Sequence, residues 1–234
     1  MRQRRRPAPR SPAGSAWLDR IAVLGFASVW SVAAVRLAWR DPSLDRLPAA
    51  AVGVLAGYLL ADFIAGLVHW LADRHFDPET PVIGPLLIAP FRAHHDDPLS
   101  ITRHHLFEVL GNNALITLPV TAALLFFPPV DSALDAFAAA LALVGTLASV
   151  ATNLFHAWAH AQRPPWIARW LQRRRLVLTP RQHARHHRGL HDQAYCVTSG
   201  WLNPLLDRMR FFAWLDARLA RSARPLRDGG TQAR

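Results

Sequence analysis

Four long apolar runs dominate this sequence of 234 residues, of which 51% are hydrophobic. They extend over Trp17–Trp39, Leu47–Ala72, Ala114–Val130 and Ser132–Ala157. A helix needs about 20 mainly apolar residues to cross the hydrocarbon core of a bilayer. The third run is the shortest and contains Pro119, but helices inside membranes tolerate proline. We therefore expect an all-α integral membrane protein with about four transmembrane helices.

The charged residues flank these runs. The chain has 27 basic residues, all of them arginine, against 16 acidic ones, and its formal net charge is +11. The arginines concentrate in the N-terminal tail and after His160, and no nucleic-acid-binding motif accompanies them. Anionic lipid headgroups are therefore the expected counter-charge, and nucleic acid is not an expected partner. The positive-inside rule places both termini in the cytoplasm, as in a multi-pass protein of a bacterial inner membrane.

The two ends of the chain differ from its middle. Residues 1–16 and 221–234 are rich in arginine and small or polar residues, so we expect disordered tails around one membrane domain at residues 17–220. The single cysteine, Cys196, excludes an internal disulfide and fits a reducing cytoplasm. Its expected role is that of a small buried hydrophobic residue.

Segments outside the four runs are expected at the membrane surface. Residues 73–113 form a long polar loop, in which the apolar stretch Pro81–Pro90 is too short to cross a bilayer and is expected to lie in the interface. Residues 166–178 and 211–220 are amphipathic and contain arginine. Both are predicted to be interfacial helices.

The twelve histidines fall into groups at the ends of apolar runs or in the polar segments beside them. The groups are His69 with His75, His94-His95, His104-His105, His156 with His160, and the four histidines from His183 to His191. His183, His186 and His187 form an HxxHH motif, whose members share one helix face. Alone, this motif fits a basic surface helix equally well. With four crossings, however, every group falls on the cytoplasmic side, which predicts one shared metal site.

The second apolar run carries three ionisable residues. Asp62, His69 and Asp73 are spaced by seven and four positions, which places them on one helix face. Ionisable groups inside an apolar helix are costly and usually functional. The alternative for Asp62 is structural, with its carboxylate hydrogen-bonded to a neighbouring helix.

The number of candidate ligands indicates two metal ions, because a structural zinc takes four ligands and a catalytic zinc three plus water. Few carboxylates accompany the histidines, unlike in the soluble di-iron bundles. Imidazole binds iron, copper, zinc and nickel, so ligand type alone does not select the element. A pair of irons that activates dioxygen against a C–H bond of a lipid chain suits this composition. A zinc hydrolase is one alternative, and a non-enzymatic scaffold or metal-sensing regulator is another.

Several motifs occur in an order that resembles the lipid desaturase family between about Leu60 and Leu219. They are Ala61-Asp62-Phe63, Gly66 to Trp70, Pro90-Phe91-Arg92 with His94-His95, Ile101 to His104, Thr152-Asn153 with His156 and His160, His183 to His187, and Tyr195-Cys196 through Gly200 to Asn203. The family includes plasmanylethanolamine desaturases of animals and bacteria and the plant plastid enzyme that desaturates palmitate.

The resemblance implies an integral membrane oxidoreductase with two non-haem irons, dioxygen as co-substrate and a membrane phospholipid as substrate. Electrons would come from a carrier such as ferredoxin or a cytochrome b5-like protein. The implied metal ligands are His69, His94, His95, His104, His156, His160, His183, His186, His187 and His191. Asp73, which follows His69-Trp70, joins them as a catalytic residue.

The implied reaction introduces the vinyl-ether double bond into the sn-1 alkyl chain of plasmanylethanolamine. A fatty-acyl desaturase or hydroxylase that acts on a phospholipid acyl chain is the alternative. The chain departs from the plasmanylethanolamine branch at His105, where Asp is expected, and at Arg74-His75, where Asp-Thr is expected. His75 and His105 are therefore interpreted as peripheral.

Overall fold

The computed structural model describes residues 16–40 and 44–222, and these contain helices and no strand. Four long helices form the bundle: α1 (Ala16–Arg40), α2 (Leu47–Arg74), α4 (Leu106–Ala123) and α5 (Ala133–His160). Each is long and apolar enough to cross a membrane. The prediction of an all-α membrane protein with four spans is confirmed. The predicted tails lie outside the described residues except at their inner ends, where Ala16 opens α1 and Ser222 closes α9.

The third span differs most from its prediction. Helix α4 begins at Leu106, inside the predicted loop, and its apolar continuation ends in a 3-10 turn at Leu124–Phe126. His105 caps its start by accepting a hydrogen bond from the Phe107 amide. Asn113 does not break the helix, because its side chain donates to the Ser149 carbonyl of α5 at 2.8 Å. Asn113, which suggested a loop, is thus a contact between two helices.

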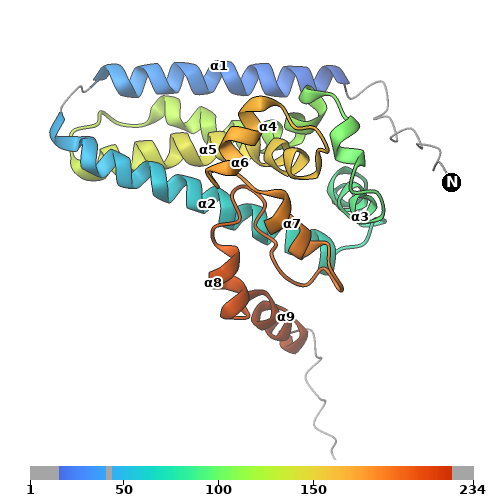
Figure 1. Ribbon diagram of the computed structural model, residues 1–234. Coiled ribbons are helices and arrows are strands. Elements are labelled where there is room, and N and C mark those ends of the chain that lie inside the picture. Colours follow the sequence, from blue (N-terminus) through green and yellow to red (C-terminus); the bar gives the residue numbers. More distant parts are fainter. Residues whose placement is uncertain (1–15, 41–43, 223–234) are drawn as a thin grey trace, which may run out of the picture.

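Helices α2 and α5 run in parallel and form the most extensive pair in the bundle, while α1 pairs with α4 (Figure 1). Glycines permit the close approach of α2 and α5. A Cβ at Gly53 would overlap the Phe137 carbonyl oxygen, and one at Gly57 would overlap that of Leu141. This spacing of small residues every fourth position is typical of helices that pack tightly in membranes. It fixes the two helices that carry ligands at their C-terminal ends.

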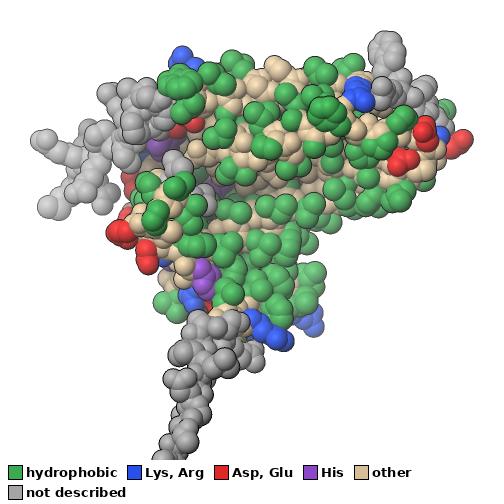
Figure 2. Space-filling model, turned by 180° about the vertical axis from the view of Figure 1, so that it is seen from behind, with side chains coloured by type: hydrophobic (Ala, Val, Ile, Leu, Met, Phe, Trp, Pro, Cys, Tyr) green, Lys and Arg blue, Asp and Glu red, His purple; other side chains and the backbone are tan. Residues whose placement is uncertain are grey.

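Short helices surround this end of the bundle. They are α3 (Ala89–Asp96), α6 (Trp166–Arg173), α7 (Pro180–His186), α8 (Asn203–Arg208) and α9 (Phe211–Ser222). The predicted helix at residues 166–178 is helical only to Arg173, and the chain turns at Arg175, whose φ is +56°. Within the predicted interfacial stretch, a π turn at Gly84–Ile88 leads into α3. Apolar side chains cover the outer face of the long helices, as a membrane protein requires (Figure 2).

Candidate metal centre

The histidines converge from four segments that are distant in sequence. Helix α2 brings His69 and Asp73 in its last turns, α3 brings a neighbouring pair, and the last turns of α5 bring another. Helix α7 and the turn after it bring four more. The assembled side chains are His69, Asp73, His94, His95, His156, His160, His183, His186, His187 and His191. The structure therefore unites nine of the ten predicted histidine ligands with Asp73.

The first group contains five histidines whose candidate ligand atoms lie within 4.8 Å of one another: His94, His156, His160, His183 and His187. The His183 Nε2 atom lies 2.8 Å from Nε2 of His156 and 3.0 Å from Nε2 of His187. Imidazole nitrogens bind metal ions at about 2.0–2.1 Å, so nitrogens that share an ion lie about 3 Å apart. The spacing of these three nitrogens matches a single ion.

The second group consists of His69, Asp73, His95 and His186, with ligand atoms that also lie within 4.8 Å of one another. The Nε2 atoms of His69 and His186 lie 3.5 and 3.4 Å from Asp73 Oδ2. The His95 Nε2 atom donates to Asp73 Oδ1 at 3.0 Å. Asp73 therefore lies at the centre of this group and supplies its one carboxylate.

Backbone carbonyls fix the orientation of two of these rings. The Nδ1 atom of His69 donates to the Tyr195 carbonyl at 3.2 Å, and Nδ1 of His186 donates to the Gln193 carbonyl at 2.9 Å. A carbonyl can only accept, so the proton is on Nδ1 and the Nε2 lone pair faces Asp73. Metal-binding histidines almost always have such a partner on the second nitrogen.

The two groups adjoin one another. His95 of the second group and His187 of the first have ring centroids 5.2 Å apart. Both also belong to a third set of close ligand atoms that includes His191. Shared neighbours of this kind suit two adjacent ions better than two independent sites.

The residues present fit a metal. Among the described residues, eight buried side-chain nitrogen and oxygen atoms have no hydrogen-bond partner, and all eight belong to these two groups. Examples are Nε2 of His69, Oδ2 of Asp73 and both ring nitrogens of His94. Unpaired buried polar atoms are costly in a folded protein unless a ligand satisfies them. Bound cations would satisfy Asp73 Oδ2 and one nitrogen on each of these rings.

The protonation state of the histidines also suits metal binding. Burial, together with the neighbouring histidines, lowers the pKa of His94 to about 2 and that of His187 to about 3. The pKa of His183 is lowered well below its usual value for the same reasons. These imidazoles are neutral at pH 7, which is the form that binds metal.

Three histidines lie outside the groups. His104 Nδ1 faces the Glu108 carboxylate at 3.0 Å, so the structure does not bring this predicted ligand together with the others. His75 lies 2.9 Å from Asp216, and His105 caps α4. The interpretation of His75 and His105 as peripheral agrees with these positions.

Asp62 has a structural role that its helix face did not reveal. It is fully buried, and its Oδ1 accepts from the amides of Thr198, Ser199 and Gly200 at 2.8–3.1 Å, while Oδ2 accepts from Leu202 at 3.3 Å. These contacts favour the structural alternative for Asp62, although its partner is a loop and not the neighbouring helix that was expected. The small residues of this loop were the only signal in the sequence.

The same loop is held at two further points. The Asn203 side chain accepts from the Cys196 amide at 2.8 Å and donates to the Cys196 carbonyl at 2.9 Å. Asp207 accepts from the Ala194 amide at 3.0 Å. Cys196 is buried as expected, against Gly66, and burial raises the pKa of its thiol. Sequence reasoning missed these residues, which position the carbonyls that bind His69 and His186.

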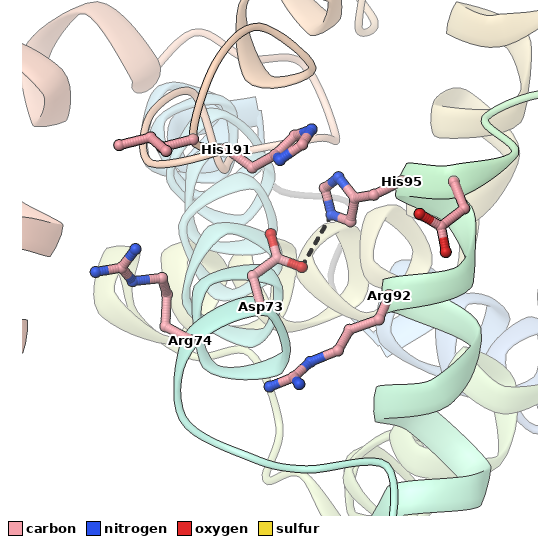
Figure 3. Close-up of a pocket in the computed structure, with 7 residues that line it drawn as sticks. Asp73, Arg74, Arg92, His95 and His191 are labelled. Atoms are coloured by element: carbon pink, nitrogen blue, oxygen red, sulfur yellow. Dashed lines mark hydrogen bonds and ion pairs between the residues drawn. The ribbon is translucent and has the colours of Figure 1, made fainter.

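A polar pocket of about 320 Å³ leads from the surface to the second group (Figure 3). It is lined by Asp73, Arg74, Arg92, His95, Asp96, Leu190 and His191. Arg92 is fixed there by the Ala72 and Phe76 carbonyls at the end of α2. The pocket gives water and protons access to Asp73, while most of the first group is buried.

Residues 58–224 match the family described as "Lipid desaturase domain". The chain is 40% identical over 191 residues to plasmanylethanolamine desaturase of Myxococcus xanthus, which covers 82% of this chain and 67% of that protein. It is 36% identical over 182 residues to plasmanylethanolamine desaturase 1 of Mus musculus (74% of this chain, 65% of that protein).

A plant relative is similar as well. The chain is 36% identical over 165 residues to chloroplastic fatty acid desaturase 4 of Arabidopsis thaliana, covering 69% of this chain and 49% of that protein. The chain thus spans about half to two thirds of the length of these relatives. No solved structure matches the chain. The matched region contains every residue of both histidine groups, and the chain belongs to the lipid desaturase family.

Proposed function

We propose that this protein is a membrane di-iron desaturase that introduces the vinyl-ether double bond into the sn-1 alkyl chain of plasmanylethanolamine. The observation that carries the proposal is the pair of adjoining groups, eight imidazoles and Asp73 with His191 beside them, at one end of a bundle suited to a membrane. The choice of substrate follows the names of the bacterial and mouse relatives.

In this proposal one iron is held by the first group and the second iron by the second group, with His191 beside both. His104 remains a predicted ligand on the strength of the family motif alone. Bound iron supplies the activation of dioxygen that removal of hydrogen from an unreactive C–H bond requires. Dioxygen is the co-substrate: the two hydrogens that leave the chain, together with two electrons from the donor and two protons, reduce it to two molecules of water as one double bond forms.

The protein's own residues orient and shield this chemistry. The Gln193 and Tyr195 carbonyls hold the protons on Nδ1 of His186 and His69, which keeps both Nε2 atoms available. The burial of His69, His156 and His186 excludes bulk water from the reacting chain. Asp73 is both central to the second group and exposed to the polar pocket, so it is placed to exchange protons with solvent.

The electron donor and the orientation are part of the same proposal. Electrons come from a ferredoxin or a cytochrome b5-like protein on the cytoplasmic side of a bacterial inner membrane, where both termini lie. The distribution of arginines supports this orientation through the positive-inside rule. The structure supports it by bringing the histidines to a single end of the bundle.

The direct test is expression in a bacterium that lacks plasmalogens, fed with an alkylglycerol so that plasmanylethanolamine forms. Mass spectrometry should detect vinyl ethers that release aldehydes in acid. His183→Ala should abolish them and lower the iron content, because His183 is central to the first group. His75→Ala is the matched control and should preserve both, because its partner is Asp216.

Other outcomes separate the alternatives. New double bonds in acyl chains without vinyl ethers would instead establish the fatty-acyl activity suggested by the Arabidopsis relative. A hydroxylated chain would identify a hydroxylase. Purified protein with zinc and no iron, and with unchanged lipids, would overturn the proposal in favour of a hydrolase or a metal-binding scaffold.

A further inference from the structure

A second cavity, an apolar groove of about 390 Å³, lies on the flank of the bundle. Its lining includes Val54, Leu55 and Tyr58 of α2, Val144 and Phe155 of α5, and Trp201. The polar atoms of the two aromatic residues are already satisfied, since the Tyr58 hydroxyl donates to the Leu176 carbonyl and the Trp201 Nε1 donates to the Arg175 carbonyl. The groove therefore offers an occupant apolar contacts only.

The groove has the dimensions of a lipid chain. Between Val144 and Phe155 helix α5 advances roughly 16 Å, at about 1.5 Å per residue. The end of the groove farther from the C-terminus of α2 is lined by exposed Val54 and Leu55, on a helix suited to cross the membrane. The opposite end of the groove reaches Phe155, which precedes His156 in the sequence. An extended hydrocarbon chain could thus enter from the bilayer and end near the level of the metal centre.

A buried layer adjoins the groove, and none of the histidines lines the groove itself. Ala159, Leu178 and Val197 form one buried cluster, against which Ala65 packs. On α2, Ala65 lies between groove-lining Tyr58 and His69, and in the segment before α7, Leu178 lies between groove-lining Val177 and His183. A chain in the groove therefore contacts none of the histidines, and the chain that is oxidised lies elsewhere.

Positive charge borders the groove. Arg173, Arg174 and Arg175 are exposed on the segment between the groove-lining residues Leu171 and Leu176. Guanidinium groups bind phosphate through charge-assisted hydrogen bonds. An apolar groove bordered by three arginines matches one chain of a phospholipid together with its phosphate.

We propose that the groove holds the chain of the substrate phospholipid that is not oxidised, the sn-2 chain, with the lipid phosphate at Arg173–Arg175. This inference rests on the proposed function, because it assigns the sn-1 chain to the metal centre. A diacyl or alkyl-acyl lipid has two chains to accommodate, and only one of them occupies the groove. The groove then selects the substrate by its sn-2 chain without affecting where the double bond forms.

The test fills the groove from its membrane side. Val54→Phe narrows the groove, and Val52→Phe, on the same exposed helix but outside the groove, is the matched control. In the vinyl-ether assay, Val54→Phe should shift the products severalfold toward shorter sn-2 chains, with the position of the double bond unchanged. If its sn-2 profile equals that of Val52→Phe, or if the sn-1 chain or bond position changes instead, the proposal is overturned.

A binding measurement keeps this result separate from the proposed function. Purified protein in phosphatidylethanolamine bilayers with a brominated sn-2 chain should show quenching of Trp201 fluorescence, taken as the difference between wild type and Trp201→Phe. Val54→Phe should reduce this quenching and Val52→Phe should not. Quenching without any vinyl-ether product would support chain binding in the groove and refute the desaturase activity. Vinyl-ether product without quenching would support the desaturase activity and refute chain binding in the groove.

Discussion

Asp62 connects helix α2 to the segment that orients His69 and His186, two of the proposed metal ligands. Its carboxylate accepts four backbone hydrogen bonds from residues 198–202, and the chain just before them includes Tyr195, whose carbonyl accepts a hydrogen bond from His69 Nδ1. The residue is thus part of the support of the metal centre although it touches none of the ligands. Such supporting partners determine how well a metal site keeps its geometry.

Replacement of Asp62 should therefore lower both stability and metal content. Asp62→Ala leaves three buried amides and the half-buried amide of Leu202 without this partner, at a cost of about 1–3 kcal/mol for each buried amide, and should abolish stable iron binding. Asp62→Asn keeps one acceptor oxygen, so its losses of thermal stability and of iron content should be smaller. Thermal unfolding and metal analysis of the purified variants measure the effect, with exposed Asp131→Asn as the control. Iron content equal to wild type in Asp62→Ala would show that the loop does not position His69.

The parallel pair α2 and α5 shows how helix packing positions the site. Its glycines bring backbones together, so the C-terminal turns that carry His69 and His156 arrive at the same place. The apolar runs in the sequence predicted the ends of α1, α2 and α5 to within a few residues. The start of α4 did not, because Asn113 is satisfied by a carbonyl of another helix, a contact that no local pattern contains.

Gly57→Leu should separate α2 from α5. Its side chain would collide with the Leu141 backbone carbonyl, which cannot move aside as a flexible side chain can. Overpacking lowers stability by about 1–3 kcal/mol when side chains can adjust. A larger loss of stability is expected in Gly57→Leu, because the obstacle is backbone. Gly25→Leu is the matched control, since a Cβ there would meet only the Leu118 side chain at 3.9 Å. Thermal stability and iron content should fall in Gly57→Leu alone, and equal losses in both variants would contradict this packing role.

The assembled molecule places its polar, histidine-bearing segments at one end and a short turn at the other. The histidine motifs predicted this arrangement well, because ligands spaced by three or four residues must share a helix face. The pairing of His186 with the Gln193 carbonyl and the supporting role of Asp62 were beyond prediction. Both depend on backbone atoms that only the folded chain brings near.

Cysteine labelling should reveal the orientation of the whole molecule. The native Cys196 is buried and should react little, so single cysteines can be added without background. In intact cells an impermeant maleimide should label Asp131→Cys, at the turn before α5, and should not label Arg163→Cys, after α5. Membrane disruption should expose the second site. The opposite pattern would place the metal centre outside the cytoplasm.

The shared direction of α2 and α5 has an electrostatic consequence. The carbonyl dipoles of a helix add up to partial negative charge at its C-terminal end, where cations are favoured. His69 and Asp73 lie in the last turns of α2, and His156 and His160 in those of α5. The backbone itself thus directs two negative poles at one point, and a centre made of neutral imidazoles and a single carboxylate gains there an attraction for dipositive ions that its side chains alone would not provide.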